Sequence, residues 1–258
     1  MKKTKVIIPA LGMLLLSTAA SVTGTVAWFA SQATVTATGM SVTVKSDSAF
    51  LLIKAGAVEG ADDAAKAAAI RTGGGAETAN ASTATGALLP VAHEDFTTGN
   101  IADIETVADS AYSNWYYRYS KNPANWGTNE SGMTAKANVA SNKFADYVLV
   151  NEFNLTLAAG SEPMNTLRVE TCTITPSNSG DAAVKVLVAT ATASQEFGNT
   201  GGSGSVTLQN SLTDQTTMQV KIYIYWDGND EDVFTNGIED LKSTAVEVKF
   251  TGLVGAAN

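Results

Sequence analysis

Apolar and polar residues alternate through most of the second half of the chain. The clearest run is Met218–Trp226 (MQVKIYIYW), and the same pattern recurs in Phe153–Leu157, Leu167–Thr175, Ala183–Thr192 and Thr244–Leu253. A period of two residues is typical of β-strands that bury one face. Segments rich in Gly, Asn, Ser or Pro separate the runs, as turns do. The pattern therefore predicts a succession of strands joined by loops.

The run Leu167–Thr175 also predicts which residues share a face. Strict alternation puts Leu167 and Val169 on one face and Cys172 and Ile174 on the other. Because Cys172 falls inside a predicted strand, we expect a packed thiol rather than a nucleophile.

The first half of the chain is less regular. Residues 33–46 predict one long strand, or two collinear strands broken at Gly39, and Ala49–Lys54 predicts another strand. Ala61–Arg71 contains strong helix formers with acidic residues early and an arginine last, which favours a short helix. The apolar residues of Ile101–Ala111 recur at helical spacing, so a second helix is expected there.

With at least eight predicted strands and few helices, the chain is expected to be all-β. The fold class that this pattern favours is a jelly-roll-like β-sandwich with a few short helices in an insertion between early strands. We expect three parts: a signal peptide over residues 1–27, an N-terminal strand over 28–46, and a single sandwich domain over 47–258 with an insertion at about 55–142.

The first 27 residues have the three regions of a secretory signal peptide. Three lysines within the first five residues precede the apolar run Val6–Leu16, and small residues follow it. The run has eleven residues, whereas a membrane-spanning helix needs about twenty. Cleavage could fall after Ala20 or after Ala27, and a retained membrane or filament-core helix is the alternative. We therefore expect a secreted protein, extracellular or on the cell surface.

The overall charge supports export and excludes several functions. The net charge is −9, and removing residues 1–27 takes away three lysines and no acid, which leaves −12. An acidic chain is unsuited to bind nucleic acid, because binding requires basic groups that neutralise phosphates. The chain has one cysteine and one histidine, so a disulfide within the chain and a cysteine-based zinc site are excluded.

Residues 23–44 (TGTVAWFASQATVTATGMSVTV) have a distinctive order: small residues, Ala-Trp-Phe, a polar spacer and a Thr-rich alternation. This junction resembles that of the TasA/camelysin family of matrix-fibre subunits, which are exported by a SipW-type signal peptidase. Residues 153–191 resemble the family's run of strands more loosely. The resemblance implies a jelly-roll core and a mature chain that begins near Trp28-Phe29. It also implies a homopolymer in which one subunit's N-terminal strand completes a sheet of the next.

The segment Trp28–Ser41 suits such a donor strand, because it alternates, is nearly uncharged and contains no proline. The alternative is that it is simply the first strand of its own sheet. The residues expected at the subunit interface are Trp28, Phe29, Val35, Ala37, Met40 and Val42.

Residues 113–127 form an aromatic segment, whose rings are Trp115, Tyr116, Tyr117, Tyr119 and Trp126. Exposed rings of this kind could stack on sugars, which would make the chain a cell-surface or virion adhesin that binds glycans. The alternative is that the rings fill the core of the sandwich. Glycans and the cell envelope are therefore candidate partners besides the chain itself.

Catalytic chemistry finds little support in the sequence. Zinc peptidases use two histidines at helical spacing with a glutamate, whereas this chain has only His93, which we expect to be a loop residue. We therefore expect no enzyme activity. The one candidate ion site is an acidic turn whose oxygens could bind Ca²⁺, or which could be a solvated hairpin. Its residues are Asp227, Asn229, Asp230, Glu231 and Asp232.

Overall fold

The computed structural model describes residues 35–42, 49–80, 88–119, 135–176, 183–198, 201–230 and 244–254. The predicted signal peptide lies outside the described residues, as do Trp28, Phe29, Trp126, Glu231 and Asp232. Within the described part of the chain, no helix is long and apolar enough to cross a membrane.

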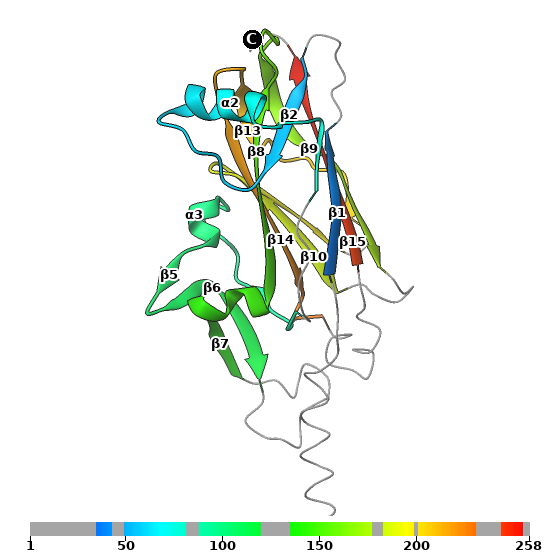
Figure 1. Ribbon diagram of the computed structural model, residues 1–258. Helices are drawn as coiled ribbons and strands as arrows, with labels where there is room; N and C mark the ends of the chain where they lie inside the picture. The colour runs from blue at the N-terminus through cyan, green and yellow to red at the C-terminus, as the bar shows by residue number, and fades with distance from the viewer. Residues whose placement is uncertain are drawn as a thin grey trace, which may run out of the picture.

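Two sheets form the body of the protein (Figure 1). The first has six strands in the order β12-β9-β15-β1-β3, with β13 also paired to β9. Its strands are β1 (Val35–Val42), β3 (Thr78–Ala79), β9 (Met164–Pro176), β12 (Gly201–Gly202), β13 (Gln209–Leu212) and β15 (Thr244–Val254).

The second sheet has five strands in the order β11-β10-β14-β8-β2, and every pairing in it is antiparallel. Its strands are β2 (Leu51–Ala55), β8 (Val148–Leu157), β10 (Val184–Ala189), β11 (Ser194–Gly198) and β14 (Met218–Trp226). The expected strand Met218–Trp226 is thus confirmed at both ends.

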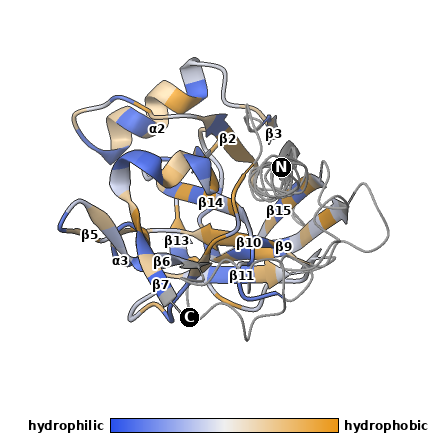
Figure 2. Ribbon diagram, turned by 90° about the horizontal axis from the view of Figure 1, so that it is seen from below, coloured by the Kyte–Doolittle hydropathy of each residue, from blue (hydrophilic) through white to orange (hydrophobic). Residues whose placement is uncertain are grey.

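A core of buried residues joins the two sheets face to face. The first sheet supplies Val169, Val248 and Phe250, among others, and the second supplies Phe153 and Ile224. Apolar residues lie along the strands where the sheets meet, whereas the helix α2 (Asp63–Thr72) mixes apolar and hydrophilic residues (Figure 2). The predicted all-β sandwich is therefore confirmed, and its description as a jelly roll stays a prediction.

A third, small sheet covers the outer face of the five-stranded sheet. It has the order β4-β6-β5, with β7 also paired to β6. The elements of this layer are β4 (Ala92–His93), the helix α3 (Ile101–Ile104), β5 (Val107–Ala108), β6 (Ala111–Tyr119), β7 (Ala135–Ala140) and the 3₁₀ helix η3 (Ser141–Asp146). Because both faces of β14 are covered, Ile222 and Ile224 pack in the first core while Tyr223 and Tyr225 pack in a second core under the small sheet.

The predicted helix at Ala61–Arg71 is confirmed as α2. Its N-cap is Asp62, whose side chain accepts a hydrogen bond from the Ala65 amide. The helix ends at Thr72, and Ala67 and Ile70 are its buried residues.

The helix expected at Ile101–Ala111 is wrong beyond its first turn. The structure has a helix only at Ile101–Ile104, and the chain then forms the hairpin β5–β6. Asp109 and Ser110 connect those strands with φ of 49° and 65°, the left-handed geometry of a tight two-residue hairpin turn. The apolar residues of the first helical turn, Ile101 and Ile104, are buried, whereas Val107 further along is 48% exposed. The expected apolar face of the helix therefore ends at Ile104.

The expected alternation in Leu167–Thr175 is wrong at one position. Val169 and Cys172 are both buried, although strict alternation would separate them. The pairing with β15 explains the change of phase, because Thr171 and Val169 lie opposite the consecutive residues Lys249 and Phe250. Glu170 is thus the extra residue of a β-bulge, which shifts every later side chain to the other face.

Candidate functional site

The N-terminal strand β1 lies in the six-stranded sheet between β15 and β3. Its ladder with β15 is parallel, and its pairing with β3 covers only two residue pairs. The register shifts between Ala37 and Met40, which is where Gly39 was expected to interrupt the strand. The chain therefore has β1 as a strand of its own sheet, which was the simpler of the two alternatives for this segment.

Four of the expected interface residues lie at register positions opposite the core-facing positions of β15. The pairs are Val35 with Thr244, Ala37 with Val246, Met40 with Val248, and Val42 with Phe250. All four β15 residues are buried, with exposed fractions of 3% or less. The strand β1 therefore continues the sheet along the stretch of β15 that carries the hydrophobic core.

The aromatic segment contributes Trp115 to the second core, and Tyr117 packs against that core. Trp115 is fully buried, and its Nε1 donates a hydrogen bond to the carbonyl oxygen of Ile104 at 3.0 Å. Tyr116 is 7% exposed. Tyr117 stacks on Tyr147 with ring centroids 5.6 Å apart, and Tyr119 ends β6. The core-filling alternative thus describes Trp115 and Tyr116, which present no open ring face to a sugar.

The acidic turn after β14 uses its first residues for contacts within the protein. Asp227 Oδ1 accepts a hydrogen bond from the Asn229 amide at 2.9 Å, and its Oδ2 lies 3.9 Å from Lys185 Nζ. The Asn229 side chain donates to the Tyr116 hydroxyl. Within the described ranges, no three acidic, histidine or cysteine side chains gather as a metal site. A calcium site here stays a prediction that depends on Glu231 and Asp232.

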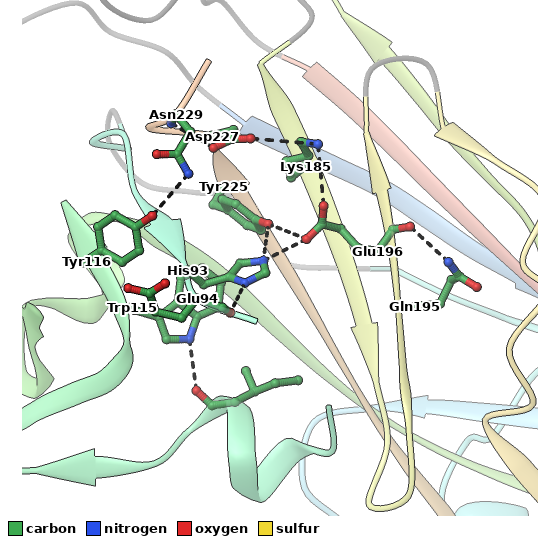
Figure 3. Close-up of polar contacts among 11 residues, drawn as sticks. His93, Glu94, Trp115, Tyr116, Lys185, Gln195, Glu196, Tyr225, Asp227 and Asn229 are labelled. Atoms are coloured by element: carbon green, nitrogen blue, oxygen red, sulfur yellow. Dashed lines mark hydrogen bonds and ion pairs between the residues drawn. The ribbon is translucent and has the colours of Figure 1, made fainter. Parts of the chain in front are cut away.

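A polar cluster that the sequence did not indicate lies where the small sheet meets the sandwich (Figure 3). His93 Nε2 lies 2.8 Å from Glu196 Oε2 and 2.9 Å from the Tyr225 hydroxyl, which donates to the same carboxylate oxygen at 3.0 Å. Lys185 Nζ lies 3.5 Å from Glu196 Oε1. These residues come from β4, β11, β14 and β10, so the cluster connects two sheets.

Aromatic rings surround the imidazole of His93. Phe96 stacks on it with centroids 4.4 Å apart, and Trp115 and Tyr225 meet it edge to face at 5.1 and 5.7 Å. The expectation of a loop residue is therefore wrong for His93, which lies in β4 with its side chain 16% exposed. The signal that the sequence did offer was the Tyr-Ile-Tyr alternation of β14, because a tyrosine face opposite an isoleucine face indicates a sheet covered on both sides.

A second, similar cluster surrounds Tyr223, which lies two residues before Tyr225 on the same face of β14. The carboxylate of Glu105 accepts hydrogen bonds from the Tyr223 hydroxyl and from Lys221 Nζ, each at 2.8 Å. Burial, and then the nearby Glu105 carboxylate, raise the pKa of Tyr223 well above its ordinary value. Each outward tyrosine of β14 thus donates to one carboxylate. Glu105 also binds Lys221, and Glu196 also contacts His93 and Lys185.

The single thiol is unsuited to chemistry. Cys172 is 2% exposed in the core between the sheets, and burial raises its pKa to about 12. Since the thiolate is the reactive form, the thiol stays inert at ordinary pH.

Comparisons with protein-family models, with curated proteins and with solved structures found no match to this chain.

Proposed function

We propose that this chain is a secreted structural subunit that polymerises with copies of itself into extracellular or biofilm-matrix fibres. In this proposal, β1 of one subunit completes the six-stranded sheet of the next by donor-strand complementation. Main-chain hydrogen bonds supply the affinity of such a contact, and alternating side chains supply its register. The observation that carries the proposal is the parallel ladder between β1 and β15.

The topology supports strand exchange because no hairpin ties β1 to a sheet neighbour. Its partner β15 lies at the other end of the chain, and the next strand in sequence, β2, belongs to the opposite sheet. The blue strand β1 and the red-brown strand β15 run side by side in Figure 1. The same ladder can therefore be formed by β1 of another subunit without opening any other strand pair of the two sheets except the short one with β3.

The chemistry of the ladder supports the same proposal. Without β1, one side of β15 would present unpaired N–H and C=O groups along Thr244–Phe250, beside the core residues Val246 and Val248. An exposed strand edge of this kind recruits another strand. The segment Trp28–Ser41 contains no charge and no proline, so nothing in it opposes pairing. The net charge of −12 expected after cleavage would keep subunits apart in solution until strands exchange.

Removing part of the donor segment tests the proposal. A variant that starts with residue 39 in place of residue 28 should give a folded protein that elutes as a monomer and forms no fibres in electron micrographs. The mature chain from Trp28 should form fibres under the same conditions. A peptide of residues 28–42 should slow fibre growth of the mature chain, and a scrambled peptide of the same composition should not. Normal fibres from the shortened variant would contradict the proposal.

The export step has its own test. N-terminal sequencing of the extracellular protein should give a start at Trp28, which would release the donor segment. A chain that retains residues 1–27 in the fibre would contradict this step.

A further inference from the structure

The segment 91–93 attaches the small sheet to the end of β14. Its backbone is fixed at Val91, whose N–H donates to the Trp226 carbonyl at 2.9 Å and whose carbonyl accepts from the Gly228 amide at 2.8 Å. Two residues later, the His93 side chain reaches Glu196 and Tyr225. Backbone and side chain thus hold the same corner of the small sheet against the sandwich. Figure 3 shows the side-chain contacts of His93.

The hydrogen bonds around His93 require both imidazole nitrogens to carry a proton. Nδ1 lies 2.8 Å from the carbonyl oxygen of Glu94, which can only accept, so Nδ1 carries a proton. Nε2 then bears a proton only when the imidazole is charged. In the charged state, Nε2–H and the Tyr225 hydroxyl both donate to Glu196 Oε2.

Loss of the Nε2 proton removes this arrangement. A lone pair of Nε2 would then face a lone pair of the Glu196 carboxylate at 2.8 Å. The single hydroxyl proton of Tyr225 can satisfy only one of the two acceptors. The neutral imidazole therefore cannot keep both contacts, and the side chains must separate.

We propose that His93, Glu196 and Tyr225 form a pH-sensitive clasp between the small sheet and the five-stranded sheet, closed while His93 is protonated and loosened when it is neutral. This clasp does not depend on polymerisation. Its opening frees the β4 corner, while Trp115 and the rest of the second core keep the small sheet in place.

The electrostatic surroundings favour the closed state. The charged and titratable groups that face the imidazole are Glu196 from β11, Tyr225 from β14, Asp227 after β14, Lys185 from β10 and Glu94 with its partner Lys136 from β7. Burial lowers the pKa of His93, but the hydrogen bonds to Glu196 and to the Glu94 carbonyl raise it more. The net result is a pKa above the ordinary 6.5.

The pKa of Glu196 moves in the complementary direction. Burial raises it, and the hydrogen bonds from His93 and Tyr225 lower it more, so it lies below the ordinary 4.5. A raised histidine pKa contributes stability that is complete below pH 6.5 and is lost as pH rises through the folded value. A lowered glutamate pKa contributes stability that is complete above pH 4.5 and is lost in more acid solution. The clasp is therefore tightest between pH 4.5 and 6.5 and loosens toward alkaline pH.

The first test is direct, because His93 is the only histidine of the chain. Its imidazole carbon and nitrogen signals, in the full chain labelled on histidine, report its titration without any assignment problem. We expect a pKa above 6.5, the Nδ1–H tautomer on the alkaline side, and a lower pKa in Glu196→Gln. A pKa at or below 6.5, or one that Glu196→Gln leaves unchanged, would overturn the proposal.

The second test measures opening of the corner. Protection of the Val91 and Glu94 amides against hydrogen exchange, corrected for the intrinsic exchange rate, should fall about tenfold between pH 6 and pH 9. His93→Phe, which keeps an aromatic ring, and Glu196→Gln should both lose this dependence. Glu105→Gln is the matched control, because it disrupts the neighbouring cluster, which contains no histidine. Equal pH dependence in all four proteins would overturn the proposal.

Discussion

The rings of Trp115 and Tyr225 meet edge to face, with centroids 5.1 Å apart and planes at 88°. Trp115 comes from the small sheet and Tyr225 from β14, so this contact joins the two sheets within the second core. Trp115 also contacts Phe144 and Tyr223. One of the five aromatic residues that the sequence offered for glycan binding thus packs between the small sheet and the sandwich.

Replacing this indole should weaken the whole protein. Trp115→Ala removes the packing in the second core and the hydrogen bond to Ile104, and we expect a loss of about 3–5 kcal/mol in the free energy of unfolding. Tyr117→Ala, at a partly exposed ring of the same strand, is the matched control and should cost less. Urea unfolding measures both. Equal effects would show that Trp115 has no special place in the core.

The pairing of β12 with β9 in the six-stranded sheet depends on one glycine. Gly201 has φ +87°, and a Cβ on it would lie 1.9 Å from the Cys172 carbonyl oxygen. Gly201→Ala must therefore move β12 away from β9, and we expect a loss of at least about 2 kcal/mol. Gly202→Ala serves as the control, because a Cβ there meets nothing within 4 Å. Thermal unfolding should separate the two variants, and similar melting temperatures would contradict the pairing of Gly201 with Thr173.

The thiol of Cys172 should be protected by the fold. Its pKa of about 12 leaves almost no thiolate at pH 8, and the side chain is buried. Iodoacetamide should thus label the native protein very slowly and the urea-unfolded protein at the rate of an ordinary thiol. Mass spectrometry reads out both rates. Fast labelling of the native protein would mean that the core between the sheets opens readily.

The sequence predicted correctly those strands in which buried and exposed residues alternate without a bulge. The strand β14 alternates without interruption, so its residues Met218–Trp226 could be found from sequence alone. In β9 the alternation changes at Glu170, because the bulge is set by the register with β15, about 80 residues further on. The register shift inside β1, between Ala37 and Met40, was indicated by Gly39 itself.

The polar cluster could not be predicted for a related reason. His93, Glu196 and Tyr225 are far apart in the sequence, and each sits in an ordinary local context. Only the covering of β14 by the small sheet brings them within hydrogen-bond distance. The hairpin turn at Asp109-Ser110 was missed because apolar residues recur at helical spacing from Ile101 onward. Only the first of these residues pack in a core, and Val107 is exposed.

The parallel ladder between β1 and β15 is the basis of the proposed fibre, and a disulfide across it tests that proposal most directly. Thr36 lies opposite Ala245, which is only half-buried, so cysteines at these two positions disturb the core little. Cys172 stays out of the reaction because its thiol is buried and its pKa is about 12.

Fibres of the Thr36→Cys/Ala245→Cys variant, grown under reducing conditions and then oxidised, are analysed on a denaturing non-reducing gel. Donor-strand exchange predicts a ladder of covalent multimers, because each β1 pairs with β15 of a neighbouring subunit. The single Thr36→Cys and Ala245→Cys variants should give no ladder. Oxidation before assembly should trap β1 in its own sheet and abolish fibre growth. Fibres that yield only internally cross-linked monomers would contradict the account.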